Sequence, residues 1–242
     1  MKLEVKEQKK REEYASLIIK YLKENKCLFS FEESSRISDA AGYFSSGFEM
    51  YDYLCLQICD ELGIIPDDQN PYKAFVETLN DVFNIENKSV VEIGGGKLLR
   101  VSKRITDMQD TGSVTVYDTN STYKNGDYPK LTVFNRKFMD AVDAVGADVL
   151  VGLLARSSAE KLVKSAIEKD KDFMVAVFNK QNQNLFCESD IDPEELNRFI
   201  EKTEHDVASS SLGKLKVKRL NEIGEQYPII YNVRDRWLYG CK

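Results

Sequence analysis

The chain has 242 residues, of which 42% are hydrophobic and 31% charged, as in ordinary globular proteins. Its formal net charge of −6 argues against a protein that binds nucleic acid over its whole surface. Two basic clusters, residues 6–11 and 214–219, are interpreted as the solvated sides of a helix and of a strand.

The N-terminal residues and the cysteines indicate the cellular compartment in which the protein is expected. Residues 1–6 run straight into charged side chains, and no apolar run approaches the roughly eighteen residues of a membrane span. The five cysteines are scattered through a chain that is large enough to fold without disulfide bonds. We therefore expect a cytoplasmic protein with no membrane association.

Residues 1–84 show the periodicity of helices. Apolar side chains recur at helical spacing over 14–22, 51–62 and 72–83. The last of these runs is preceded by Asn70-Pro71, a capping residue followed by a first-turn proline. Residues 30–47, rich in serine, glycine and aromatics, are expected to form a loop or a broken helix. The sequence thus predicts an all-helical N-terminal segment.

From residue 85 onward, short β-rich runs alternate with helical periodicity. Strands are expected at 89–93, 113–117, 131–134, 148–152, 173–178, 215–220 and 228–233. Helices are expected to begin near 98, 157 and 192. Such alternation predicts right-handed crossovers and a mostly parallel sheet with helices on both faces. The last two strands are too close for a helical crossover and should pair antiparallel. The prediction for 85–242 is an α/β, Rossmann-like domain with seven strands.

The strongest local signal is VVEIGGGKLL, from Val90 to Leu99, where a strand enters three glycines and then a helix. Glycines there permit a tight turn and let a ligand approach the backbone without meeting a Cβ atom. A P-loop would need serine or threonine after Lys97, where Leu98 stands. A dinucleotide fingerprint that starts at Gly94 would need its third glycine at Leu99. Neither phosphate-binding motif is therefore complete.

A third pattern is an acid, a hydrophobic residue and the glycines, Glu92-Ile93-Gly94-Gly95-Gly96. It resembles motif I of the class I S-adenosylmethionine-dependent methyltransferases, whose ligand has no phosphate and needs only close backbone approach. The next strand ends at Asp118, where a carboxylate can accept hydrogen bonds from both hydroxyls of a ribose. Dehydrogenases use the same device, so Asp118 indicates an adenosine ligand without saying which one.

The resemblance covers roughly residues 85–235 and implies a ligand site at the carboxyl edge of the sheet. In that family, residues after the third strand surround the adenine, and the tip of the fourth strand faces the reacting methyl group. The corresponding S-adenosylmethionine-binding set in this chain is Glu92, Gly94, Gly95, Gly96, Asp118, Thr119, Phe138, Met139, Gly152 and Leu153.

No motif identifies the methyl acceptor, which is expected to be a small molecule or RNA. The Asn/Asp-Pro-Pro-Tyr/Phe segment of adenine amino methylases is absent after the fourth strand, and no cysteine stands beside a proline at a strand tip. Methyl transfer requires mainly alignment of the acceptor with the methyl carbon, so no catalytic residue is assigned. The N-terminal helices are expected to cover the acceptor site or to form a homodimer.

Two other functions remain open beside methyl transfer. The chain could keep the fold for binding or assembly without catalysis, since it lacks a diagnostic acceptor motif. It could also be a nicotinamide-dependent oxidoreductase, which Leu99 and the closing antiparallel strands disfavour. No metal site is predicted, because Cys55 and Cys59 fit core packing and His205 fits a surface position.

Overall fold

The computed structural model of the chain describes residues 5–47, 52–66, 70–108, 110–139, 142–153, 156–176, 193–222 and 225–234. The chain forms two compact units, which divide between Asn70 and Pro71. No helix among the described residues has the length and apolar character needed to cross a bilayer.

The first unit is helical. It contains α1 (Val5–Glu24), a 3-10 turn η1 (Lys26–Leu28), α2 (Phe31–Ser45) and α3 (Tyr53–Glu61). α1 packs against both α2 and α3. The buried side chains at this packing include Ile18 of α1, Ile37 of α2 and Ile58 of α3, each fully inaccessible to solvent. Cys55 and Cys59 are also buried in α3, and the pKa of Cys55 is raised by its hydrogen bond with Cys59 and by burial.

The expectation of a loop or broken helix over 30–47 is wrong, because α2 is continuous from Phe31 to Ser45. Ser30 caps the helix: its hydroxyl accepts a hydrogen bond from the Glu33 N–H, and the Glu33 carboxylate accepts one from the Ser30 N–H at 2.7 Å. A buried stripe that includes Ile37 and Ala41 faces the rest of the unit. Packing of this stripe outweighs the low helix propensity of serine and glycine.

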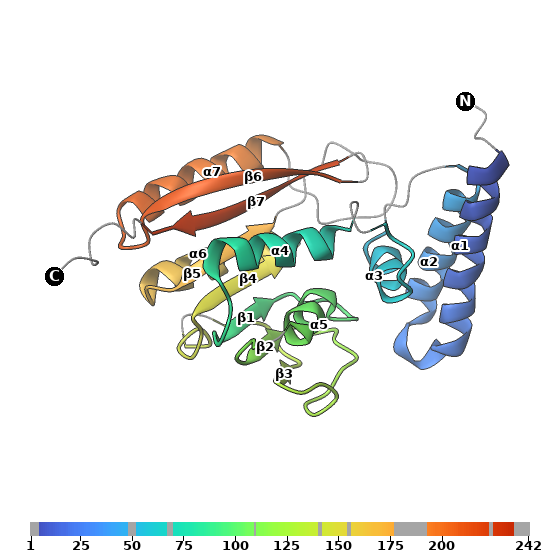
Figure 1. Cartoon of the computed structure of the whole chain (residues 1–242), viewed down its shortest axis with the longest axis horizontal. Coiled ribbons are helices and arrows are strands. Elements are labelled where there is room, and N and C mark those ends of the chain that lie inside the picture. Colours follow the sequence, from blue (N-terminus) through green and yellow to red (C-terminus); the bar gives the residue numbers. More distant parts are fainter. Residues whose placement is uncertain are drawn as a thin grey trace. The chain divides into compact units, whose positions relative to one another are not determined.

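The second unit is built on a seven-stranded sheet (Figure 1). Its strands are β1 (Val90–Ile93), β2 (Val114–Tyr117), β3 (Leu131–Phe134), β4 (Val149–Leu153), β5 (Asp172–Ala176), β6 (Lys214–Glu222) and β7 (Glu225–Val233). The strand order is β3-β2-β1-β4-β5-β7-β6. β1 to β5 are parallel, and β7 runs antiparallel to both β5 and β6. The predicted Rossmann-like sheet with its closing antiparallel pair is confirmed.

In the described segments of this unit, four helices cover the two faces of the sheet: α4 (Pro71–Phe83), α5 (Arg100–Asp107), α6 (Arg156–Glu168) and α7 (Pro193–Ala208). Apolar residues of α4 and α5 pack with one face of the strands, and those of α6 and α7 pack with the other (Figure 1). α4 therefore belongs with the sheet, because its apolar stripe, including Phe75 and Leu79, joins the sheet core. The sequence-based boundary at residues 84 and 85 leaves this helix in the N-terminal segment.

A buried amide closes the antiparallel end of the sheet. The Asn232 side chain of β7 is fully inaccessible and accepts a hydrogen bond from the Phe173 N–H at 2.7 Å. It donates to the Asp172 carboxylate at 3.0 Å and to the Leu212 carbonyl at 3.2 Å. Arg234 continues this network with a 2.6 Å bond to the Asp172 carboxylate. Asn232 thus ties β7 to β5 and to the turn that precedes β6.

We expect Asn232→Ala to lower the free energy of unfolding by about 2 kcal/mol, since the substitution leaves buried backbone groups without partners. Ser209→Ala is the control, because it removes one exposed hydrogen bond to the His205 carbonyl and should change stability by less than about 0.5 kcal/mol. Denaturant unfolding followed by near-UV circular dichroism measures both variants. Equal losses in the two variants would contradict a structural role for Asn232.

Candidate functional site

The ends of the parallel strands bring the predicted site residues to one edge of the sheet. Ile93 of β1 pairs in register with Tyr117 of β2, which pairs in turn with Phe134 of β3. The glycine loop and Asp118, which follow the first two strands, therefore leave the sheet side by side. In open α/β sheets this carboxyl edge is where ligands bind. Binding by these residues stays a prediction.

The three glycines of the loop are required for two reasons, backbone conformation at Gly94 and Gly96 and lack of space at Gly95. Gly94 and Gly96 have φ angles of 74° and 73°, which side chains with a Cβ atom rarely adopt. Gly95 is constrained by space: a Cβ atom there would lie 2.8 Å from Val116 Cγ1 and 2.9 Å from Leu99 Cδ2. The loop is thus packed tightly against β2 and the start of α5.

Leu99 occupies the position that a dinucleotide fingerprint gives to its third glycine. It has a left-handed backbone conformation, with φ 51°, and stands at the N-cap of α5. Its side chain is fully buried and its Cδ2 atom approaches Gly95 from behind the loop. The backbone conformation is therefore one that suits glycine, but a leucine side chain fills the space behind the loop.

Asp118 is hydrogen-bonded to the glycine loop. Its Oδ2 atom accepts a hydrogen bond from the Gly96 N–H at 2.8 Å, and Oδ1 accepts one from the Asn120 N–H at 2.6 Å. The side chain is half-buried, whereas the neighbouring Thr119 is exposed. Since each carboxylate oxygen has two lone pairs, both oxygens keep capacity to accept a further hydrogen bond from a ligand hydroxyl.

Glu92 lies beneath the same loop and is only 1% exposed. Its register partners on the neighbouring strands are Val116 and Val151, so the carboxyl group stands between two apolar side chains. The Ser102 hydroxyl of α5 donates a hydrogen bond to its Oε2 atom. Burial raises the pKa of Glu92 to about 7; the Ser102 hydrogen bond opposes this shift and the charge of Asp118 adds to it. Glu92 therefore changes charge near neutral pH.

The raised pKa of Glu92 predicts a specific pH dependence of stability. Between its ordinary value of 4.5 and about 7, the folded state holds a proton that the unfolded state has lost, so stability falls as the pH rises through this window. Glu92→Gln cannot titrate. We expect its stability relative to the parent protein to increase by about 3 kcal/mol between roughly pH 4 and pH 8, because one pKa unit corresponds to about 1.4 kcal/mol. Urea unfolding of both proteins across this pH range tests the prediction. It would be refuted if the free energies of unfolding of the parent and of Glu92→Gln changed with pH in parallel.

Gly95→Ala should destabilise the second unit by about 1–3 kcal/mol, since the added methyl group overpacks the contact with Val116 and Leu99. The matched variant is Gly146→Ala in the same unit, where a Cβ atom meets nothing within 4 Å. We expect Gly146→Ala to be neutral or slightly stabilising. Thermal unfolding of both proteins makes the comparison, and equal melting temperatures would show that the loop tolerates a side chain.

An aromatic cluster lies at the carboxyl ends of β2 and β3. The Tyr117 and Phe134 rings stack with centroids 5.1 Å apart, and Phe138 meets Tyr117 edge-on at 5.6 Å. The Arg136 guanidinium lies 4.7 Å from the Tyr117 centroid. Phe138 is buried, whereas Met139 is 65% exposed. Of the two residues expected near adenine, one therefore packs in the core and the other faces outward.

Arg136 and Asp143 fix the segment that carries Phe138 and Met139. Their side chains share two hydrogen bonds, of 2.7 and 2.6 Å, and Asp143 also accepts one from the Met139 N–H at 2.9 Å. The guanidinium holds the pKa of Asp143 below its ordinary value. Sequence reasoning missed both residues, because they lie in a loop, where no periodic pattern marks an Arg–Asp pair.

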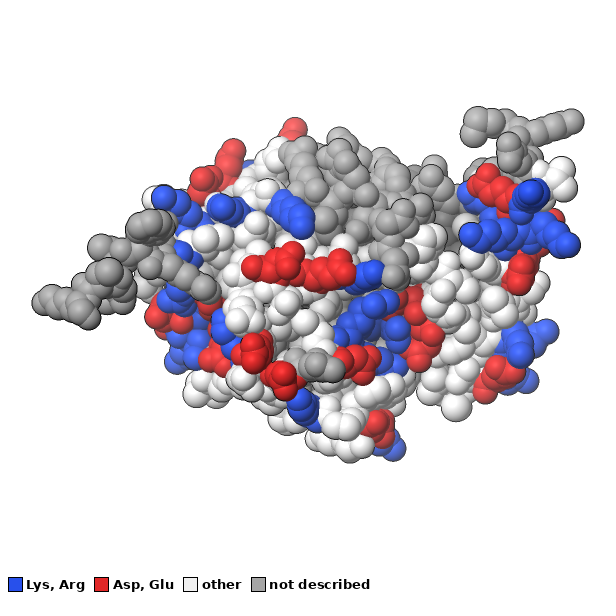
Figure 2. Space-filling view, in the orientation of Figure 1, with Lys and Arg blue, Asp and Glu red and all other residues white. Residues whose placement is uncertain are grey.

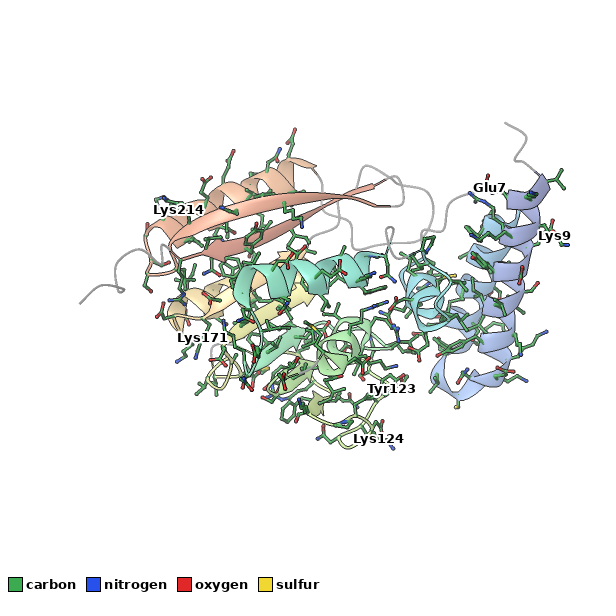
Figure 3. The ribbon with its side chains drawn as sticks, in the orientation of Figure 1. Glu7, Lys9, Tyr123, Lys124, Lys171 and Lys214 are labelled. Carbon is green, nitrogen blue, oxygen red and sulfur yellow. The ribbon has the colours of Figure 1, made fainter. Side chains whose placement is uncertain are left out.

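The connection from β2 to β3 has no helix and is tied to α5 instead. The Lys97 carbonyl accepts hydrogen bonds from the N–H and hydroxyl of Thr122, at 3.2 and 2.9 Å. The buried Lys103 ammonium donates to the Tyr123 hydroxyl and lies 5.2 Å from the Tyr128 ring centroid. Tyr123 is labelled in Figure 3 on this loop. These contacts hold the loop that begins at Asp118.

Gly152 and Leu153 form the tip of β4, as predicted, and both are buried. Leu153 pairs in register with Ala176 at the end of β5. Asp140, which follows Met139, and residues 154–155 lie outside the described residues. The β4 tip therefore borders the edge that carries the glycine loop.

Comparison with known proteins finds no matching family model and no matching curated protein. Among solved structures, similar chains include a SAM-dependent methyltransferase from Aquifex aeolicus, at 12% identity and TM-score 0.46, covering 75% of this chain and 98% of that one. Another is magnesium protoporphyrin IX methyltransferase from Synechocystis PCC 6803 with bound SAM, at 12% identity and TM-score 0.48, covering 92% and 97%.

A 16S rRNA (adenine(1408)-N(1))-methyltransferase from Catenulisporales acidiphilia is also similar, at 14% identity and TM-score 0.43, covering 66% of this chain and 90% of that one. At these identities and TM-scores, the likenesses assign no activity to the chain. The strand order and the pairing directions described above define its fold.

Proposed function

We propose that the second unit binds S-adenosylmethionine and transfers its methyl group to an acceptor. The observation that carries this proposal is the hydrogen bond between the Gly96 N–H and the Asp118 carboxylate. It joins an acid at the end of β2, where adenosine sites carry the acid that binds ribose, to a glycine loop that has neither the P-loop nor the complete dinucleotide pattern. An adenosyl ligand without a phosphate matches this combination.

In this proposal each group has one role. Asp118 accepts hydrogen bonds from the ribose hydroxyls, and the Gly94–Gly96 backbone lets the sulfur-bearing part of the ligand approach closely. Phe138 and Met139 border the adenine, with Thr119 at the rim, and Gly152 and Leu153 border the methyl group. When bound, S-adenosylmethionine supplies an electrophilic methyl carbon. The protein's part is then to align the acceptor with that carbon and to exclude water.

For the acceptor we favour a small molecule over RNA. An RNA acceptor needs a continuous basic surface for its phosphates. On the face drawn in Figure 2, acidic and basic side chains are interspersed, and the net charge of the chain is −6. The helical first unit is our candidate for the part that covers the acceptor or mediates homodimerisation.

Calorimetric titration with S-adenosylmethionine, S-adenosylhomocysteine and NAD tests the proposed identity of the ligand. We expect both adenosyl-sulfur ligands to bind and NAD to give no heat. Asp118→Ala should raise Kd at least about tenfold, because a charge-assisted hydrogen bond contributes roughly 1.5–3 kcal/mol. Asp127→Ala is the control, since Asp127 lies in the same loop and accepts only a local bond from the Lys124 N–H.

Three outcomes are informative. Binding of NAD alone would replace the proposal with an oxidoreductase. Absence of binding to either adenosyl-sulfur ligand would refute it. Binding without transfer of a labelled methyl group to a metabolite extract would leave the ligand assignment standing and overturn the catalytic part.

A further inference from the structure

Glu92 is a buried acid that packs directly under the glycine loop. A Cβ atom added to Gly95 would lie 3.2 Å from the Oε2 atom of Glu92. The Glu92 carboxyl group is therefore packed against the backbone of the glycine loop. Its face of β1 also carries Val90, which belongs to the apolar core under α4 and α5. A charge on Glu92 is therefore poorly shielded by water and acts at close range on whatever lies over the loop.

The groups that face Glu92 do not neutralise such a charge. On β2 and β4 its neighbours in register are Val116 and Val151. On α5 the Ser102 hydroxyl donates its hydrogen bond, and among the described residues no salt bridge to Glu92 is formed. Within the described part of the chain, the charged group that acts on Glu92 is Asp118, itself an acid, whose charge further raises the pKa of Glu92. Lys103, next to Ser102, directs its ammonium toward Tyr123.

The proposed ligand and its product differ by one charge, which is carried by the sulfur atom. S-adenosylmethionine carries a sulfonium, whereas S-adenosylhomocysteine has a neutral thioether at the same place. The sulfur is joined through one carbon to the ribose. If Asp118 holds the ribose hydroxyls, the sulfur is kept beside Gly94–Gly96 and within range of Glu92.

We propose that Glu92 is a charge-specificity residue: when ionised, it favours the sulfonium ligand over the neutral thioether product. This inference rests on the proposed function and goes beyond it by assigning the discrimination between substrate and product to one buried acid. Binding of the sulfonium then favours ionisation of Glu92, whose proton passes to the solvent buffer. Loss of the methyl group removes the positive charge, and the product is held less tightly.

The predicted signature is a pH-dependent preference. Well below neutral pH, at about pH 5, Glu92 is protonated with either ligand and gives no electrostatic preference. Above neutral pH, the affinity for S-adenosylmethionine relative to S-adenosylhomocysteine should be about tenfold higher than at low pH. A tenfold change corresponds to a Glu92 pKa that is about one unit lower in the complex with the sulfonium ligand. The positive charge, not the methyl group, is the cause.

Calorimetric titration of the full chain at about pH 5 and about pH 9 tests this with three ligands: S-adenosylmethionine, S-adenosylhomocysteine and sinefungin, in which a protonated amine replaces the sulfonium. Because the ligands' own amino groups titrate alike for every protein variant, the difference between the parent and Glu92→Gln isolates Glu92. We expect the pH dependence of the affinity ratio to disappear in Glu92→Gln and to remain in Glu86→Gln, an exposed glutamate before β1.

Ser102→Ala is a second variant in case Glu92→Gln does not fold. It removes the hydrogen bond that lowers the pKa of Glu92, so the rise in preference should move to higher pH. Sinefungin should follow S-adenosylmethionine. An affinity ratio with the same pH dependence in the parent and in both variants would overturn the inference while the binding proposal stands. Failure of all three ligands to bind the parent protein would instead overturn the proposed function.

Discussion

The hydrogen bond from the Gly96 N–H to the Asp118 carboxylate joins the two loops on which the site depends. It can form because β1 and β2 end in register, with Ile93 opposite Tyr117. The Gly94 N–H adds a second link, a 2.9 Å bond to the Tyr117 carbonyl. The parallel pairing of β1 and β2 therefore sets the distance between the two loops. The glycines let the backbone turn tightly enough for the loops to meet.

Two carboxyl groups at this loop also bear on which ligands are compatible with it. Loops that bind phosphate surround the anion with N–H groups and cations. Here one backbone N–H, that of Gly96, is already bonded to Asp118, and Glu92 lies beneath the loop. The chemistry of these residues therefore suits a ligand that is neutral or positively charged where it crosses the glycines.

Much of the fold could be predicted from the sequence, because apolar strands next to glycines and amphipathic helices leave strong periodic patterns. The position of the glycine loop and Asp118 at one edge of the sheet could be predicted too, because each directly follows an apolar strand. α2 was missed because its serines and Gly42 obscured the capping pair Ser30 and Glu33. The Arg136–Asp143 pair and the burial of Glu92 between valines depend on three-dimensional packing, and no spacing in the chain encodes them.

The connection between β2 and β3 has a consequence for motion. Without a helix, its order depends on a few side chains, among them Lys103 held against Tyr123 and Tyr128. Segments with few backbone hydrogen bonds open locally at a lower free energy than the core strands. Opening of this loop would break the contacts of Lys103 with Tyr123 and Tyr128 while leaving the sheet intact. The segment after Asp118 can thus open locally without global unfolding, and under the proposed function this local opening is the step that would let a bound nucleoside leave.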